Sequence, residues 1–130
     1  MNCMLLIYGD ESGWNALPPD RIQAIMADYE AYAGTLVQAG VMRGGSELAP
    51  VHTATTVRRR DGRLDCTDGP FAETKEQLGG YFLIEVPTLD DAIAWAGKCP
   101  AVSHGFAVEI RPLMGAETHC DGEDARTAAA

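Results

Sequence analysis

Three ionisable side chains lie within eight residues of one sharp turn in this sequence. Asp68 begins the run Asp-Gly-Pro-Phe, and Glu73 and Lys75 follow it closely. Two carboxylates and an amine in one cleft can shift one another's pKa enough to act as acid and base. The alternative is a solvated loop that carries an ordinary Glu/Lys pair. The sequence alone leaves both interpretations open.

The local sequence forces the chain to turn at this point. Gly69 accepts a positive φ, and Pro70 fixes its own φ near the value of a first helical residue. Gly79 and Gly80 then predict a hinge before an extended segment over 81–86. A charged loop held between two strands is a typical place for a functional site. Phe71, inside the turn, is therefore a candidate ligand contact.

Other single residues could also take part in a site. His104 precedes the last predicted strand and is either a base or a loop residue, and His52 is predicted to lie on the surface. Tyr8 and Tyr29 are further candidates for ligand binding. His119 and Cys120 are adjacent in an acidic segment and lack the four-ligand spacing of a zinc site. The sequence also lacks a phosphate-binding glycine loop and a nucleophile elbow, so we predict no metal and no cofactor.

Composition narrows the class of protein. The chain has 130 residues, of which 46% are hydrophobic and 22% charged, as expected for one globular domain. Its net charge of −9, with no evident basic face, disfavours binding to nucleic acid or to anionic membranes. The longest apolar run is too short to cross a bilayer, and the first residues do not resemble a signal peptide. We therefore expect a cytoplasmic protein. The four cysteines form no C-x-x-C pair, which predicts reduced thiols.

Hydrophobic periodicity predicts the order of the elements. The segment 3–8 is apolar at every position and is predicted to be a central strand. Apolar residues three and four apart predict a helix over 19–39, with Gly40 at its C-terminal cap, and a second helix from Thr88 to about Pro100, with Thr88 as N-cap and Asp91 as its capping-box partner. Further strands are predicted over 41–50, 52–59, 63–67, 81–86 and 106–111. Residues 9–15 are predicted to be a polar connection. The domain is expected to span 1–114, followed by a disordered acidic tail over 115–130.

The surest local feature is a β-hairpin around Asp61-Gly62, the preferred type I′ turn. A two-residue turn places four side chains on one face, namely Thr55, Val57, Leu64 and Cys66. Asp68 continues the same parity, which predicts that its carboxylate points inward. Alternatively, Asp68 turns back to cap the backbone of residues 70 and 71.

This order of elements predicts an α+β fold. It is the ferredoxin-like, split βαβ plan with an extra hairpin, in which helices cover one face of an antiparallel sheet. Because the central strands are apolar on both faces, the second face also needs a cover. A second copy stacked sheet to sheet is the simplest one, so we expect a homodimer.

The run DGPFAETKE, followed by LGGYFLIE, resembles the DGPF branch of the YCII-related family. The opening MLLIYGDE, the segment QAGV followed by a glycine pair, and the closing VEIRPL fit the same family over about residues 1–114. The resemblance implies a dimeric α/β-barrel type of ferredoxin-like fold. Most members are uncharacterised, and their genes often lie beside extracytoplasmic-function sigma factors.

Some YCII-like proteins are thought to use a His/Asp pair as acid and base, with the His on the first helix. The first helix here has no His, and Tyr29 or Tyr32 takes its place in a rough alignment. An unperturbed Tyr titrates near about pH 10 and is a poor base at neutral pH. Two functional classes follow: a cofactor-free enzyme of lyase, isomerase or hydrolase type, and a non-catalytic dimer that binds a ligand or a protein such as a sigma factor.

Overall fold

The computed structural model describes residues 1–114. The elements in chain order are β1 (Asn2–Gly9), α1 (Glu11–Asn15), α2 (Pro19–Gln38), β2 (Met42–Glu47), η1 (Val51–Thr53), β3 (Thr55–Arg60), β4 (Arg63–Asp68), β5 (Gln77–Glu85), α3 (Leu89–Gly97), α4 (Pro100–Ser103) and β6 (Ala107–Pro112). The predicted tail over 115–130, with His119 and Cys120, lies outside the described residues.

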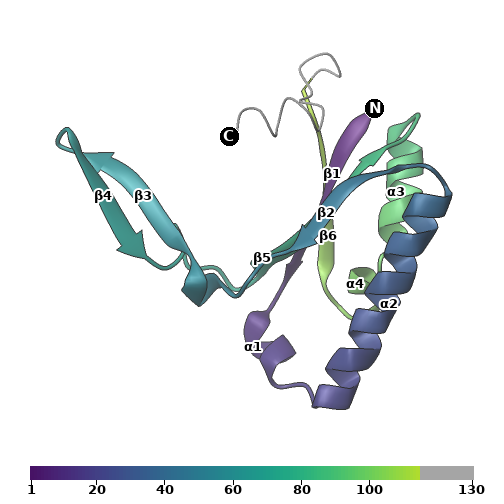
Figure 1. Ribbon diagram of the computed structural model, residues 1–130, viewed down its shortest axis with the longest axis horizontal. Coiled ribbons are helices and arrows are strands. Elements are labelled where there is room, and N and C mark those ends of the chain that lie inside the picture. Colours follow the sequence, from purple (N-terminus) through teal and green to yellow (C-terminus); the bar gives the residue numbers. More distant parts are fainter. Residues whose placement is uncertain (115–130) are drawn as a thin grey trace.

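Four strands form the main sheet in the order β2-β5-β1-β6, and every neighbouring pair is antiparallel (Figure 1). With the hairpin left out, this is the strand order of the split βαβ plan. The predicted α+β class and the central position of β1 are therefore confirmed. The hairpin β3–β4 forms a separate two-stranded sheet, which projects away from the helices in Figure 1.

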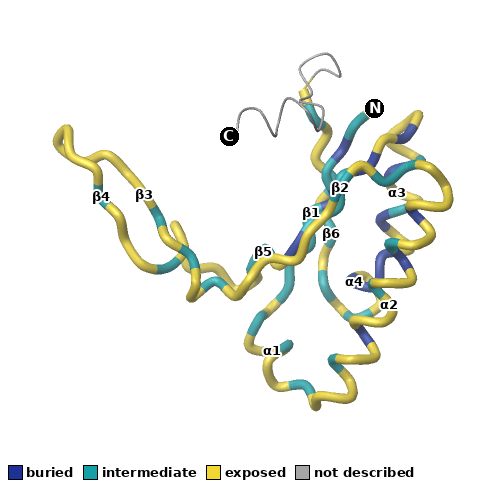
Figure 2. Tube along the Cα trace, in the orientation of Figure 1, coloured by how far each residue is buried: buried dark blue, intermediate teal, exposed yellow. Residues whose placement is uncertain are grey.

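The hydrophobic core lies between the sheet and the helices. Cys3 and Leu5 of β1, Ile84 of β5 and Leu36 of α2 are completely buried there (Figure 2). Tyr32 of α2 also belongs to this core. It was left out of the apolar stripe that predicts the helix, which consists of Ile22, Ile25, Met26, Tyr29, Ala33, Leu36 and Val37. Its ring meets Phe82 edge on, with the ring centroids 5.3 Å apart. Its hydroxyl donates to the Trp95 carbonyl at 2.7 Å and so joins α2 to α3.

The opposite side of the sheet, which we call the open face, carries an apolar centre made of Met4, Leu6, Tyr8, Tyr81 and Leu83. Met4 lies opposite Leu83, and Leu6 lies opposite Tyr81. These side chains are half-buried. Two exposed ion pairs flank them, Arg43–Glu85 at 3.0 Å and Arg111–Glu109 at 3.3 Å. No helix in the described part of the chain covers this face.

Capping interactions explain where α3 begins and where α2 ends. The Thr88 hydroxyl accepts from the Asp91 N–H, and the Asp91 carboxylate accepts from the Thr88 N–H, so the predicted capping box is confirmed. Gly40 follows α2 with a φ of +75°, as a C-terminal glycine should. Leu89, Ala92, Ile93 and Ala96 are spaced to form the buried stripe of α3, and this prediction is half right, because Ala92 and Ala96 are buried whereas Leu89 and Ile93 are exposed.

Several predicted boundaries are wrong. Residues 11–15 form α1, because the Asp10 carboxylate caps it by accepting from the Ser12 N–H. His52 lies in η1, so β3 starts at Thr55. Pro100 begins a short helix of its own, which suits a first helical position. Gly79 and Gly80 belong to β5, where the register shifts opposite Ile7 and Tyr8, and they are not a hinge.

The hairpin has the predicted type I′ turn, with φ of 51° at Asp61 and 78° at Gly62. Its predicted register is also confirmed, since Val57 lies opposite Cys66 and Arg58 opposite Asp65. The expectation that the protein lacks a basic cluster is wrong at this point. Arg58, Arg59, Arg60 and Arg63 gather on the hairpin, with Arg60 paired to Asp65 at 3.1 Å.

We predict that Tyr32→Phe lowers the free energy of unfolding by about 1 kcal/mol, because it deletes one largely buried hydrogen bond. The Trp95 carbonyl also accepts from the Lys98 N–H, so the loss should stay modest. Tyr29→Phe is the matched control, since the Tyr29 hydroxyl makes no hydrogen bond within residues 1–114. Urea unfolding measures both. Equal losses in the two variants would contradict the assignment.

Candidate functional site

The Asp-Gly-Pro-Phe turn lies at the base of the projecting hairpin. Gly69 has a φ of +103°, which a side chain would strain. Its N–H donates to the Ala54 carbonyl at 2.7 Å, and its carbonyl accepts from the Thr56 hydroxyl at 2.8 Å. The Phe71 ring is 73% exposed and lies beneath the Arg58 guanidinium, 4.6 Å from its centroid. These contacts close the hairpin at its base.

Neither prediction for the Asp68 side chain is correct. Asp68 does lie opposite Thr55, on the face of Val57 and Leu64, but that face is exposed to solvent. Val57 is 55% and Leu64 64% exposed, because the hairpin packs on no other sheet. The carboxylate makes no hydrogen bond or ion pair within residues 1–114, and Pro70 has no N–H to offer. The turn depends on Gly69, and the carboxylate takes no visible part.

The segment that follows the Asp-Gly-Pro-Phe turn, up to Gln77 at the start of β5, leads to a cavity in the body of the protein. Gln77 accepts from the Glu11 N–H at 2.9 Å and donates to the Thr74 carbonyl at 2.5 Å. The Glu11 carboxylate accepts in turn from the Val51 N–H at 3.1 Å. These bonds join the motif, α1 and the segment after β2 into one wall. Glu73 and Lys75 are exposed on the outer side of this segment.

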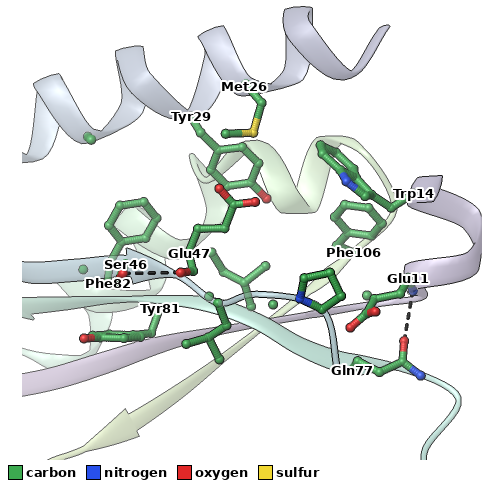
Figure 3. Close-up of a pocket in the computed structure, with 18 of the residues that line it drawn as sticks. Glu11, Trp14, Met26, Tyr29, Ser46, Glu47, Gln77, Tyr81, Phe82 and Phe106 are labelled. Atoms are coloured by element: carbon green, nitrogen blue, oxygen red, sulfur yellow. Dashed lines mark hydrogen bonds between the residues drawn. The ribbon is translucent and has the colours of Figure 1, made fainter. Parts of the chain in front are cut away.

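The cavity has a volume of about 400 Å³ and lies between α2, α1 and the sheet. This volume falls within the usual range for small-molecule sites. Figure 3 shows Tyr29 and Met26 reaching down from α2, with Trp14 and Phe106 at one end. The lining is mostly apolar and aromatic; it includes Ile7, Trp14, Met26, Tyr29, Ala33, Met42, Leu48, Pro50, Phe82 and Phe106. Asp10, Glu11, Ser46, Glu47 and Gln77 add polar groups at the rim.

Two glycines in the strands leave this space open. Gly45 and Gly80 line the cavity from β2 and β5, where larger side chains would fill it. A Cβ atom at Gly45 would lie 2.9 Å from the Tyr81 carbonyl oxygen, and one at Gly80 would lie 3.0 Å from the Ser46 carbonyl oxygen. A side chain at either position would therefore force the neighbouring backbone to shift, which favours glycine at both.

Tyr29 and Glu47 are the cavity residues best suited to chemistry. In Figure 3 the Glu47 side chain extends from the end of β2 toward the Tyr29 hydroxyl. Burial raises the pKa of Tyr29 above its ordinary value, and the Cys99 thiol and the Glu47 carboxylate raise it further. The phenol therefore stays protonated at neutral pH and can donate a hydrogen bond. The Glu47 carboxylate has no hydrogen-bond partner within residues 1–114.

Of the seven predicted site residues, Tyr29 lines the cavity and the other six do not. His104 caps the end of α4, with its Nε2 3.6 Å from the Asp28 carboxylate. Tyr8 belongs to the open face, opposite Ala107 of β6. Asp68 and Phe71 lie at the hairpin base. The structure therefore does not bring the predicted group together.

Sequence reasoning missed most of the residues that form the cavity. Trp14 lies in a segment expected to be a polar connection, where a single large aromatic residue was the available signal. Glu47 lies near the end of an edge strand and Phe106 just before β6, and neither position has a distinctive local pattern. Their proximity depends on how α1 and α2 pack, which periodicity does not report.

The described residues hold few other candidate sites. No three His, Cys, Asp or Glu side chains in residues 1–114 lie close enough to hold a metal ion. Cys3 and Cys99 are buried and Cys66 is exposed, and all three are free thiols. Within the same residues, no helix is both long and apolar enough to cross a membrane.

Comparison with known proteins places the chain in a family. The model of the YCII-related domain matches residues 1–117. The chain belongs to the YCII-related family. It is also 36% identical, over 110 residues, to an uncharacterized protein of Rhizobium meliloti (strain 1021), a match that covers 84% of this chain and 89% of that protein.

The tyrosines of α2 can be compared with the acid–base His of some YCII-like proteins. The resemblance placed the acid–base His of some YCII-like proteins on the first helix and aligned Tyr29 or Tyr32 with it. The structure separates the two, because Tyr29 faces the cavity whereas Tyr32 is buried in the core and bonded to Trp95. Of these two tyrosines, Tyr29 is therefore the one that lines the cavity, together with Met26 and Ala33 of the same helix.

We predict that Gly45→Ala destabilises the protein by about 1 to 3 kcal/mol, because its methyl group would overlap the Tyr81 carbonyl and the Phe82 ring. Gly34→Ala, on the exposed side of α2 with no atom within 4 Å of the new methyl group, is the control. It should be neutral or stabilising by up to about 1 kcal/mol. Thermal unfolding measures both changes. A Gly45→Ala variant as stable as Gly34→Ala would contradict the close approach of the strands.

Proposed function

We propose that this protein binds a small, largely apolar molecule in the cavity between α2 and the sheet. The observation that supports this proposal is the cavity itself, with a volume of about 400 Å³, an apolar and aromatic lining and polar groups at its rim. The space opens to solvent, since Met26 and Leu48 in its lining are 39% and 41% exposed, and glycine at Gly45 and Gly80 leaves room for it on the side of the sheet.

We further propose that any reaction in this cavity is a cofactor-free proton transfer, as in lyases, isomerases or hydrolases. Glu47 would accept a proton from the bound molecule, and the Tyr29 phenol would donate a hydrogen bond to the oxygen on which negative charge develops. Burial supports the second role, because it keeps the Tyr29 phenol protonated. The earlier catalytic candidates are Asp68, Glu73, Lys75 and His104. The charge of Lys75 contributes, after the hydrogen bonds from Ser12, to the lowered pKa of Asp10 at the rim.

A non-catalytic function is the second proposal, and the open face supports it. The apolar centre of that face would be covered by a second copy of the chain, which gives a homodimer of the dimeric α/β-barrel type. The projecting hairpin offers a further exposed surface, through Val57 and Leu64. Such a dimer could bind a ligand without turnover, or a protein such as a sigma factor in the cytoplasm.

To test ligand binding, a metabolite library is screened against the full chain by thermal shift. A ligand present at about one hundred times its dissociation constant should stabilise the fold by roughly 2.7 kcal/mol. Ala33→Phe fills the cavity and should abolish this stabilisation, while Ala27→Phe, on the same helix but outside the lining, should retain it. Circular dichroism checks that both variants fold. Equal stabilisation of the two variants would exclude the cavity as the site.

The homodimer is tested by light scattering at micromolar concentration, where the expected mass is that of two 13.9 kDa chains. Leu83→Glu puts a charge at the centre of the open face and should yield monomers, because the dimer would have to bury an unpaired carboxylate. Ile93→Glu, an equally apolar but exposed position on α3, should remain dimeric. A monomeric wild-type chain at this concentration would refute the proposal.

A further inference from the structure

We propose that the ligand of the cavity is an organic cation, an apolar body that carries an amine or a quaternary ammonium group. This inference rests on the proposed function, since it names the chemistry of the molecule that the same cavity would take. The charged side chains of its lining are Asp10, Glu11 and Glu47, and no Lys, Arg or His belongs to that lining. The charged groups of the cavity lining are therefore all acidic, and the rest of the lining is mostly apolar.

Glu47 is the carboxylate available to such a ligand. Asp10 already accepts hydrogen bonds from the N–H and the hydroxyl of Ser12, and Glu11 accepts from the Val51 N–H. Glu47 is exposed, so water solvates its carboxylate, which has no protein hydrogen-bond partner within residues 1–114, and its side chain extends toward Tyr29 (Figure 3). A bound ammonium group would replace that water through a charge-assisted hydrogen bond or a salt bridge.

Aromatic rings complete a surface that suits a cation. Trp14 and Phe106 lie at one end of the cavity with their ring centroids 6.4 Å apart, and Tyr29 and Phe82 line it farther along (Figure 3). The faces of such rings attract ammonium groups, and indole attracts them most strongly. Because burial raises the pKa of Tyr29, its phenol stays protonated and uncharged at neutral pH.

The other ligand classes fit the described residues less well. An anion would meet three carboxylates. The pKa of Asp10 is lowered mainly by its hydrogen bonds from Ser12 and less by the charge of Lys75, and Lys75 does not line the cavity. A neutral apolar ligand would cover Glu47 without giving it a partner, which is unfavourable. A metal ion is disfavoured because no three potential ligands in residues 1–114 lie close enough together.

The test uses four ligands that share one apolar body and differ in charge: 4-phenylbutylamine, its trimethylammonium analogue, 4-phenylbutanol and 4-phenylbutyrate. Affinities are measured by calorimetry with the full chain at pH 7. The two cations should bind about tenfold or more tightly than the alcohol, and the carboxylate should bind most weakly. Raising the salt concentration should reduce the advantage of the cations and leave the alcohol unchanged.

Glu47→Gln should remove most of the difference between amine and alcohol. Glu30→Gln changes the net charge by the same amount on the exposed side of α2, outside the cavity, and should leave the difference intact. Equal binding of amine and alcohol by the wild type, or tighter binding of the carboxylate, would overturn the inference while leaving the proposed function standing. Absence of binding by all four compounds at millimolar concentration also overturns it. The proposed function fails only if the library screen, too, finds no ligand that Ala33→Phe blocks.

Discussion

The close approach of the strands at Gly45 and Gly80 is the constraint on which the site depends. A Cβ atom would lie 2.9 Å from the Tyr81 carbonyl oxygen at Gly45 and 3.0 Å from the Ser46 carbonyl oxygen at Gly80, so a side chain at either position would force the neighbouring strand to shift. At these two positions the sheet has no side chain beneath α2, and the side chains of Ile7, Met42 and Phe82 line the space around them. The helix is held at the required distance by Tyr32 and Leu36, which pack in the core. The space between them is the cavity, and the helix positions that face it include Met26, Tyr29 and Ala33.

The contacts of the Asp-Gly-Pro-Phe motif are structural, whereas its charged side chains suggested acid–base chemistry. Its first half closes the hairpin through the bonds of Gly69 to Ala54 and Thr56. The segment after the motif reaches the cavity wall through Gln77, which bonds to Thr74 and to the N–H of Glu11. The motif thus links a projecting hairpin to one wall of the cavity. A partner that binds the hairpin would act on a segment that is hydrogen-bonded to that wall.

Local signals in the sequence predict the framework well. Asp61-Gly62, Gly40 and the Thr88/Asp91 box each fix a turn or a helix end through their own backbone preferences, and each is confirmed. The prediction that Asp68 points inward is wrong because parity within a hairpin does not tell whether anything covers that face. The candidate site was largely missed for a similar reason. Trp14, Glu47 and Phe106 come from three distant segments, and only the packing of α1 and α2 on the sheet brings them together.

The central claim is that ligands bind between α2 and the sheet and not at the Asp-Gly-Pro-Phe turn. The most direct measurement is a two-dimensional 15N–1H NMR titration of the full chain with the tightest ligand found. The account predicts that the amide signals of residues 26–33, 45–48 and 106 shift, while those of 68–71 stay in place. Shifts confined to 68–71, with the signals of Tyr29 and Glu47 unchanged, would contradict it.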